Sequence, residues 1–151
     1  MKTKILTSGW LLKHEEKGLS LACSVPSTVF ETLLSHSIIE DPFYGVNEHK
    51  VQWVYESDWV YETVFDMDNG MVADQKAPTI LRFHGLDTFS EISLNGTVIG
   101  HSDDMFQLYD FPIESLVKPK GNLLSIKFSS PTRLGREEIK KNKIRLSNAM
   151  G

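Results

Sequence analysis

Short runs in which apolar and polar residues alternate cover much of the chain, and such runs are typical of half-buried β-strands. They predict six or seven strands, at residues 19–25, 59–67, 79–86, 90–94, 97–100 and 105–111 and in a last run from 121 to 130. Turn residues separate these runs at intervals of about 8 to 12 residues, as in antiparallel sandwiches. A parallel sheet would need helices between its strands, so we expect an all-β antiparallel sandwich or jelly roll.

The segment 90–100 predicts a β-hairpin. Ile92 and Leu94 fall on one face of its first strand. Asn95-Gly96 follows, and this dipeptide is preferred at the centre of a type I′ turn, where both residues need a positive φ. We therefore expect the chain to reverse at Asn95-Gly96.

One short amphipathic helix is expected over residues 28–36. Thr28 and Glu31 have the spacing of a capping box, in which each side chain accepts a hydrogen bond from the other residue's backbone N–H. Apolar residues recur at helical spacing behind them, at Val29, Phe30, Leu33, Leu34 and Ile38.

Residues 39–57 show no sustained period, although they carry acidic and amide groups among aromatic residues. We expect a long ordered loop, and such loops are often functional or packed against another part of the molecule. The alternative is a structural crossing between sheets, kept in place by Phe43, Tyr44, Trp53 and Tyr55.

The composition fits one globular domain, with 151 residues, 40% hydrophobic and 24% charged. No apolar run reaches the roughly 20 residues of a membrane span, and charged residues follow the N-terminus too soon for a signal peptide. We therefore expect a cytoplasmic protein with no membrane partner.

The net charge of −4 argues against a general affinity for nucleic acid. Residues 131–151 carry six basic and two acidic side chains, a charge of +4, which leaves −8 on the rest. No aromatic residue interleaves the basic ones, so we favour a solvated helix with an ion pair between Glu137 and Lys141 and expect no nucleic-acid partner. We divide the chain into a β-sandwich at 1–130 and a helical or irregular basic tail at 131–151.

The sequence offers little for a metal, cofactor or nucleophile. Cys23 is the only cysteine, which excludes an internal disulfide, and we interpret it as a small buried side chain. The five histidines are scattered singly, and the sequence has no GxSxG, Walker A or GxGxxG motif. We expect no metal and no cofactor.

Carboxylate chemistry remains, because glycoside hydrolysis needs two carboxylates across the scissile bond. Asp41, Glu48, Asp103 and Asp104 lie in predicted loops, where they could face a sugar, although solvated carboxylates would follow the same pattern. Aromatic residues could stack on a sugar, although a sandwich core also absorbs aromatics; they are Phe43, Tyr44, Trp53, Trp59 and Phe106.

Three stretches carry a resemblance when they are read in order. The first is Val25-Pro26-Ser27-Thr28-Val29-Phe30-Glu31, and the second is Asp41-Pro42-Phe43-Tyr44-Gly45-Val46-Asn47-Glu48 with Trp53 and Trp59-Val60-Tyr61 after it. The third runs from Leu81-Arg82-Phe83-His84-Gly85 through Leu94-Asn95-Gly96 and Met105-Phe106 to Asn122-Leu123-Leu124. Together they resemble the N-terminal sugar-binding domain of β-mannosidases in glycoside hydrolase family 2.

The resemblance implies a galactose-binding-like jelly roll, in agreement with the strand pattern. It implies no catalytic residue in this chain, because the family's acid/base and nucleophile glutamates lie on a later (β/α)8 barrel. The family's Gly-Trp-Asp-Trp-Gly stretch has no match before Gly151, so we expect a domain truncated before its closing strand. An uncovered sheet edge would then invite self-association.

We accordingly expect a non-catalytic domain of an enzyme that removes terminal β-linked mannose, inactive alone. Its partners would be the catalytic barrel of the same parent chain and, in the assembled enzyme, a mannoside. Two alternatives are an independent carbohydrate-binding module, which exposed Trp53 or Trp59 would favour, and a purely structural interaction domain. The candidate contact residues are Asp41, Tyr44, Asn47, Glu48 and Trp53.

Overall fold

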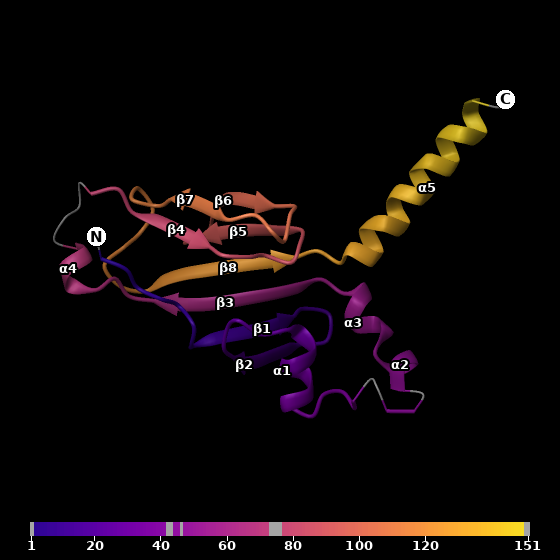
Figure 1. Ribbon diagram of the computed structural model, residues 1–151, viewed down its shortest axis with the longest axis horizontal. Helices are drawn as coiled ribbons and strands as arrows, with labels where there is room; N and C mark the ends of the chain where they lie inside the picture. The colour runs from indigo at the N-terminus through magenta and orange to yellow at the C-terminus, as the bar shows by residue number, and fades with distance from the viewer. Residues whose placement is uncertain (1, 42–43, 46, 73–76, 150–151) are drawn as a thin grey trace.

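The computed structural model describes residues 2–41, 44–45, 47–72 and 77–149, with side chains for all of these except 72 and 141–149. Six strands form the main sheet in the order β2-β1-β3-β8-β5-β6 (Figure 1). They are β1 (Trp10–His14), β2 (Leu19–Cys23), β3 (Trp59–Phe65), β5 (Ser90–Leu94), β6 (Thr97–Ser102) and β8 (Asn122–Phe128). A second sheet pairs β4 (Ile80–Phe83) with β7 (Tyr109–Pro112). Every pairing in both sheets is antiparallel, which confirms the predicted class of fold.

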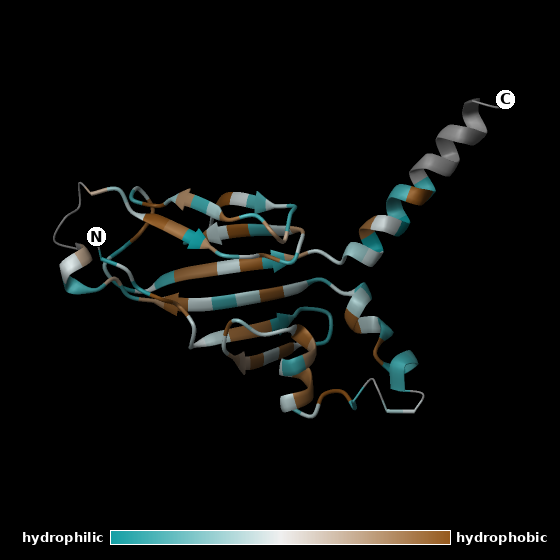
Figure 2. Cartoon of the chain, in the orientation of Figure 1, coloured by the Kyte–Doolittle hydropathy of each residue, from teal (hydrophilic) through white to brown (hydrophobic). Residues whose placement is uncertain are grey.

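One face of the main sheet builds the core. Buried and exposed side chains alternate along its strands, and Figure 2 shows the matching change of hydropathy along the central strands. The second sheet packs over the β6 end of this face, where Phe111 lies against Gly100. A Cβ on Gly100 would come within 2.1 Å of the Phe111 ring, so only glycine allows this approach. The fully enclosed apolar side chains of the main sheet are Leu12, Ile92, Leu94 and Leu124.

The predicted hairpin and the predicted helix are both confirmed. Asn95 and Gly96 have φ values of 52° and 83°, as a type I′ turn requires. Helix α1 (Val29–Ser35) begins after Thr28, whose hydroxyl accepts from the N–H of Glu31 at 3.1 Å while the Glu31 carboxylate accepts from the N–H of Thr28 at 2.9 Å. Leu33 of α1 is fully buried, which fixes the helix against the sheet.

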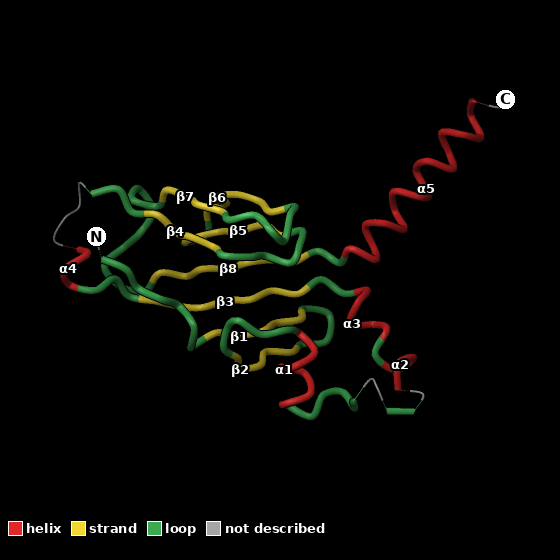
Figure 3. Tube along the Cα trace, viewed as in Figure 1, coloured by secondary structure: helices red, strands yellow, loops and turns green. Residues whose placement is uncertain are grey.

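Residues 39–57 differ from the predicted loop. They contain two short helices, α2 (Asn47–Lys50) and α3 (Gln52–Glu56), which Figure 3 shows between α1 and β3. Each helix is too short for a helical period to show in the sequence. Another short helix, α4 (Asn69–Val72), follows β3, and Phe43 lies outside the described residues.

The tail is helical over α5 (Pro131–Ala149), which leaves the end of β8 and projects away from the sheets (Figures 1 and 3). The side chain of Lys141 lies outside the described residues, so the expected pair with Glu137 is not tested. Glu137 instead pairs with Arg133 one turn earlier, at 3.1 Å. No helix in the described part of the chain is long and apolar enough to cross a membrane.

Candidate functional site

The structure gathers three of the five candidate residues into one turn before α2. The backbone N–H of Tyr44 donates to the carbonyl of Asp41 at 3.2 Å, and the side-chain amide of Asn47 donates to the same carbonyl at 3.1 Å. Gly45 has a φ of +65°, which permits the reversal. The Tyr44 side chain is 79% exposed and Glu48 is also exposed on α2. This turn therefore presents an aromatic ring and a carboxylate to solvent.

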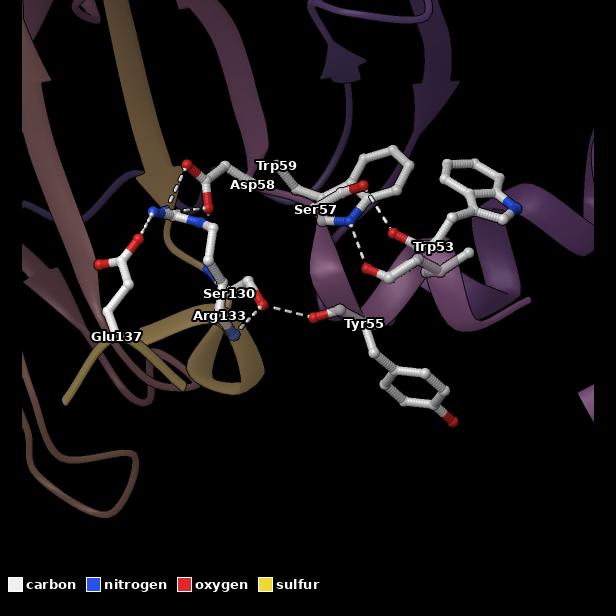
Figure 4. Close-up of polar contacts among 9 residues, drawn as sticks. Trp53, Tyr55, Ser57, Asp58, Trp59, Ser130, Arg133 and Glu137 are labelled. Carbon is white, nitrogen blue, oxygen red and sulfur yellow. Dashed lines mark hydrogen bonds and ion pairs between the residues drawn. The ribbon is translucent and has the colours of Figure 1, made fainter. Parts of the chain in front are cut away.

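Trp53, the fifth candidate residue, lies apart from this turn and packs toward the sheet. Its ring centroid lies 5.8 Å from that of Trp59 and 5.8 Å from that of His14, and the Lys17 ammonium lies 4.5 Å from its ring centroid. Trp59 is buried, and its indole N–H donates to the carbonyl of Val54 at 3.0 Å (Figure 4). With its neighbours packed in this way, Trp53 serves the fold more than it offers a stacking platform.

A polar junction that the sequence did not reveal ties this segment to the tail. The Asp58 carboxylate accepts from the N–H of Ser130 at 2.9 Å and from one guanidinium nitrogen of Arg133, which is 2.8 Å from each of its oxygens (Figure 4). The Ser130 hydroxyl donates to the carbonyl of Tyr55 at 2.5 Å and accepts from the N–H of Arg133 at 3.0 Å. The end of α3 is thereby bonded to the start of α5.

Electrostatics at this junction favour the charged state of Asp58. Partial burial alone would raise the pKa of its carboxyl, but the hydrogen bonds from Arg133 and Ser130 and the positive charges of Arg133 and Lys127 together hold that pKa below its ordinary value. A second ion pair lies beside it, between Arg136 and Glu56 at 2.8 Å.

A metal site and the thiol of Cys23 are the remaining candidates for chemistry. The described residues contain no group of three or more His, Cys, Asp or Glu side chains that could hold a metal ion. Burial raises the pKa of the Cys23 thiol, and a hydrogen bond with Thr32 offsets this only in part. A raised thiol pKa disfavours the thiolate, which is the reactive form.

Comparison with known proteins gives a consistent picture. The chain is 39% identical over 128 residues to a β-mannosidase B from Thermothelomyces thermophilus and 34% identical over 125 residues to a β-mannosidase from Rattus norvegicus, in each case across 83% of this chain. It spans only 15% and 14% of the lengths of these two proteins.

Solved structures agree on the fold. A β-D-mannosidase from Dictyoglomus thermophilum superposes with a TM-score of 0.86 at 34% identity, over 93% of this chain and 17% of its own. An exo-chitosanase from Amycolatopsis orientalis, at 21% identity and a TM-score of 0.68 over 81% of this chain and 16% of its own, shares the fold. The glycosyl hydrolase 2 galactose-binding domain-like family matches residues 10–150, and this chain belongs to that family.

Proposed function

We propose that this chain is a non-catalytic N-terminal domain of a β-mannosidase that hydrolyses terminal β-linked mannose residues. The observation that carries the proposal is the TM-score of 0.86 with a β-D-mannosidase, of which this chain spans only 17%. In such an enzyme the acid/base and nucleophile carboxylates would lie on a separate barrel domain of the same polypeptide. The β-sandwich formed by this chain would support that barrel.

The turn before α2 is the surface that we assign to this contact. Its hydrogen bonds hold Asp41, Tyr44 and Asn47 in place, while Tyr44 and Glu48 point their polar or aromatic ends to solvent. A partner that covers this surface would bury the exposed Tyr44 ring and remove its apolar face from water.

The proposal predicts that the purified chain has no glycosidase activity. An assay with an aryl β-mannoside should show no turnover above the buffer rate. Turnover that is lost in Asp41→Asn or Glu48→Gln, with a Glu15→Gln variant as the surface control, would contradict the proposal. It would mean that carboxylates of this chain perform the hydrolysis.

A carbohydrate-binding module is the second candidate, and one observation favours it. A surface depression of about 320 Å³ lies beside the start of β5. Glu91 and Lys127, which are cross-strand neighbours, offer an acceptor and a donor for sugar hydroxyls, and the half-exposed Phe89 offers an apolar surface. The depression is lined by Phe89, Ser90, Glu91, His101, Ser102, Lys127 and Ser129.

A titration with mannose and β-1,4-mannobiose, followed by amide and indole NMR shifts, separates the two candidates. Saturable shifts around residues 89–91 or 41–59 would support an autonomous sugar site. A folded sample whose NMR shifts do not change at millimolar sugar would favour the proposed role of supporting the barrel. Glu91→Gln tests whether any shifts arise from the depression, and Glu48→Gln tests whether they arise from the turn.

Self-association through a sheet edge is a further part of the proposal. In the described part of the chain, β4 and β7 each pair with one strand only, and Ile80 of β4 is 53% exposed. Open edges of this kind can pair with another copy. Light scattering should therefore show dimers or larger species at high protein concentration, and a monomer at every concentration would contradict it.

A further inference from the structure

Asp58 joins two parts of the chain that are distant in sequence. It lies between α3 and β3, and its hydrogen-bond partners Ser130 and Arg133 lie at the start of α5, up to 75 residues away. The Arg133 side chain is 40% exposed and that of Asp58 is 30% exposed, so the ion pair lies at the edge of the fold. The junction therefore links elements without belonging to the core.

Contacts at more than one point fix both the position and the rotation of α5. The Ser130 hydroxyl caps the first turn of α5 through the N–H of Arg133 and also donates to the carbonyl of Tyr55. Arg136, one turn along, pairs with Glu56 at the end of α3. Several bonds separated along a helix oppose rotation about its first residue, which one bond cannot do.

Little else in the structure holds the described part of α5. Its side chains from Pro131 to Lys140 are exposed or half-buried, and α3 is the element against which it mainly packs. The helix points away from both sheets (Figure 1). Its direction therefore depends on the junction at Asp58.

We propose that Asp58 is a positioning residue that locks α3 and α5 into one rigid unit. The direction of α5 is then set relative to the turn at Asp41 and Tyr44. This inference rests on the proposed function, since that direction matters only if a further domain follows. The same lock would present the turn and α5 to one partner in a fixed relation.

Distance measurement by double electron–electron resonance tests the lock on the full chain. Spin labels are placed at Thr97→Cys in the hairpin and Glu138→Cys on α5, in a Cys23→Ser background, because Thr97 and Glu138 are both exposed. We expect one narrow distance distribution. Asp58→Asn keeps the shape of the side chain but removes its charge, and we expect the narrow distribution to be lost.

Asp110→Asn is the matched control, because Asp110 forms an ion pair of similar length with Arg82 that holds no helix. We expect its distribution to stay narrow. A narrow distribution in Asp58→Asn, or equal broadening in Asp110→Asn, would overturn the proposal.

Arg133→Gln removes the same ion pair from the exposed side of α5 and keeps the test decisive if Asp58→Asn does not fold. Loss of the narrow distribution in Arg133→Gln supports the lock, and its retention overturns it. Amide NMR spectra of β3 and β8 check that the main sheet is intact. No sugar or partner takes part in the distance measurement. Its failure would therefore leave the proposed β-mannosidase role intact, and that role is tested separately by the activity assay.

Discussion

Two arginine–aspartate ion pairs in this domain have similar contact distances but differ in geometry and in surroundings. In one pair, Arg82 donates from two nitrogens to the two oxygens of Asp110, at 2.7 and 2.8 Å. In the other, one nitrogen of Arg133 lies 2.8 Å from both oxygens of Asp58. Arg82 and Asp110 are direct cross-strand neighbours on β4 and β7, whereas Asp58 also binds the N–H of Ser130.

The comparison teaches that the contribution of an ion pair depends on what else holds the two elements together. The backbone ladder between β4 and β7 already aligns Arg82 with Asp110, so their ion pair adds little constraint. At Asp58 the β3–β8 ladder ends at Trp59 and Phe128. Beyond it, side chains connect α3 with α5: Asp58 binds Ser130 and Arg133, the Ser130 hydroxyl binds the carbonyl of Tyr55, and Arg136 pairs with Glu56.

The largest effect is expected for Asp58→Ala. The variant leaves the Ser130 N–H without its acceptor and the Arg133 guanidinium with Glu137 alone. Hydrogen bonds to charged groups contribute about 1.5–3 kcal/mol each. Partial exposure screens the pair, so we expect the free energy of unfolding to fall by about 2 kcal/mol. Urea unfolding followed by tryptophan fluorescence measures it, because Trp59 is the next residue.

A loss close to zero for Asp58→Ala would place this pair with the Arg82 pair and remove the difference between them. The parent chain and Asp58→Ala must show the same dependence of unfolding free energy on urea concentration, since a changed slope would indicate a changed unfolded state.

Ser130→Ala should have a smaller effect. It removes the cap of α5 and leaves the carbonyl of Tyr55 without its donor, although Asp58 keeps Arg133. Loss of a serine N-cap costs about 1 kcal/mol. Ser130→Thr keeps a hydroxyl and is the matched control; equal losses in the two variants would contradict a role for the hydroxyl.

Local patterns in the sequence were enough for the elements whose signals are local. The alternation in β3, β5 and β8 and the capping box of α1 involve neighbours within a few residues, and the structure confirms both. Strand β1 was not predicted, because apolar Leu11 lies on its exposed face and polar His14 on its buried face, which hides the alternation. His14 is buried only because Trp53 and Trp59 pack against it from distant parts of the chain.

The candidate site divides in the same way. Asp41, Tyr44 and Asn47 lie within seven positions, so a sequence motif could bring them together, and the turn does so. Ser130-Pro131 carries a recognisable helix start, with serine as the N-cap and proline in the first turn. Nothing near Asp58 in the sequence indicates its partners, because a contact across 75 residues depends on the packing of β3 against β8.

Acid should remove the contribution that the charged Asp58 carboxylate makes at neutral pH. The folded-state pKa of Asp58 lies below its unfolded value, so the stabilisation is complete above the unfolded value and is lost as the pH falls through the folded one. The charged groups around Asp58 are Arg133 and Glu137 of α5 and Lys127 of β8.

We therefore expect the stability difference between the parent chain and Asp58→Asn to be constant from pH 7 down to about pH 5 and to shrink below about pH 4. Asp110, whose pKa the hydrogen bond from Arg82 also lowers, is present in both proteins and cancels from the difference. Urea unfolding at a series of pH values measures it. A difference that grows as the pH falls would contradict the assigned direction of the Asp58 pKa.

Asp110→Ala should have the smallest effect, and the comparison is sharpest here. Arg82 is about half exposed, so water replaces the lost carboxylate, and the β4–β7 ladder remains. We expect no measurable change in the urea midpoint at moderate salt, and no change in the amide NMR shifts of α5. A loss of stability as large as that of Asp58→Ala would show that an arginine–aspartate ion pair stabilises this fold wherever it occurs. The connection that Asp58 makes between distant elements would then not account for its effect.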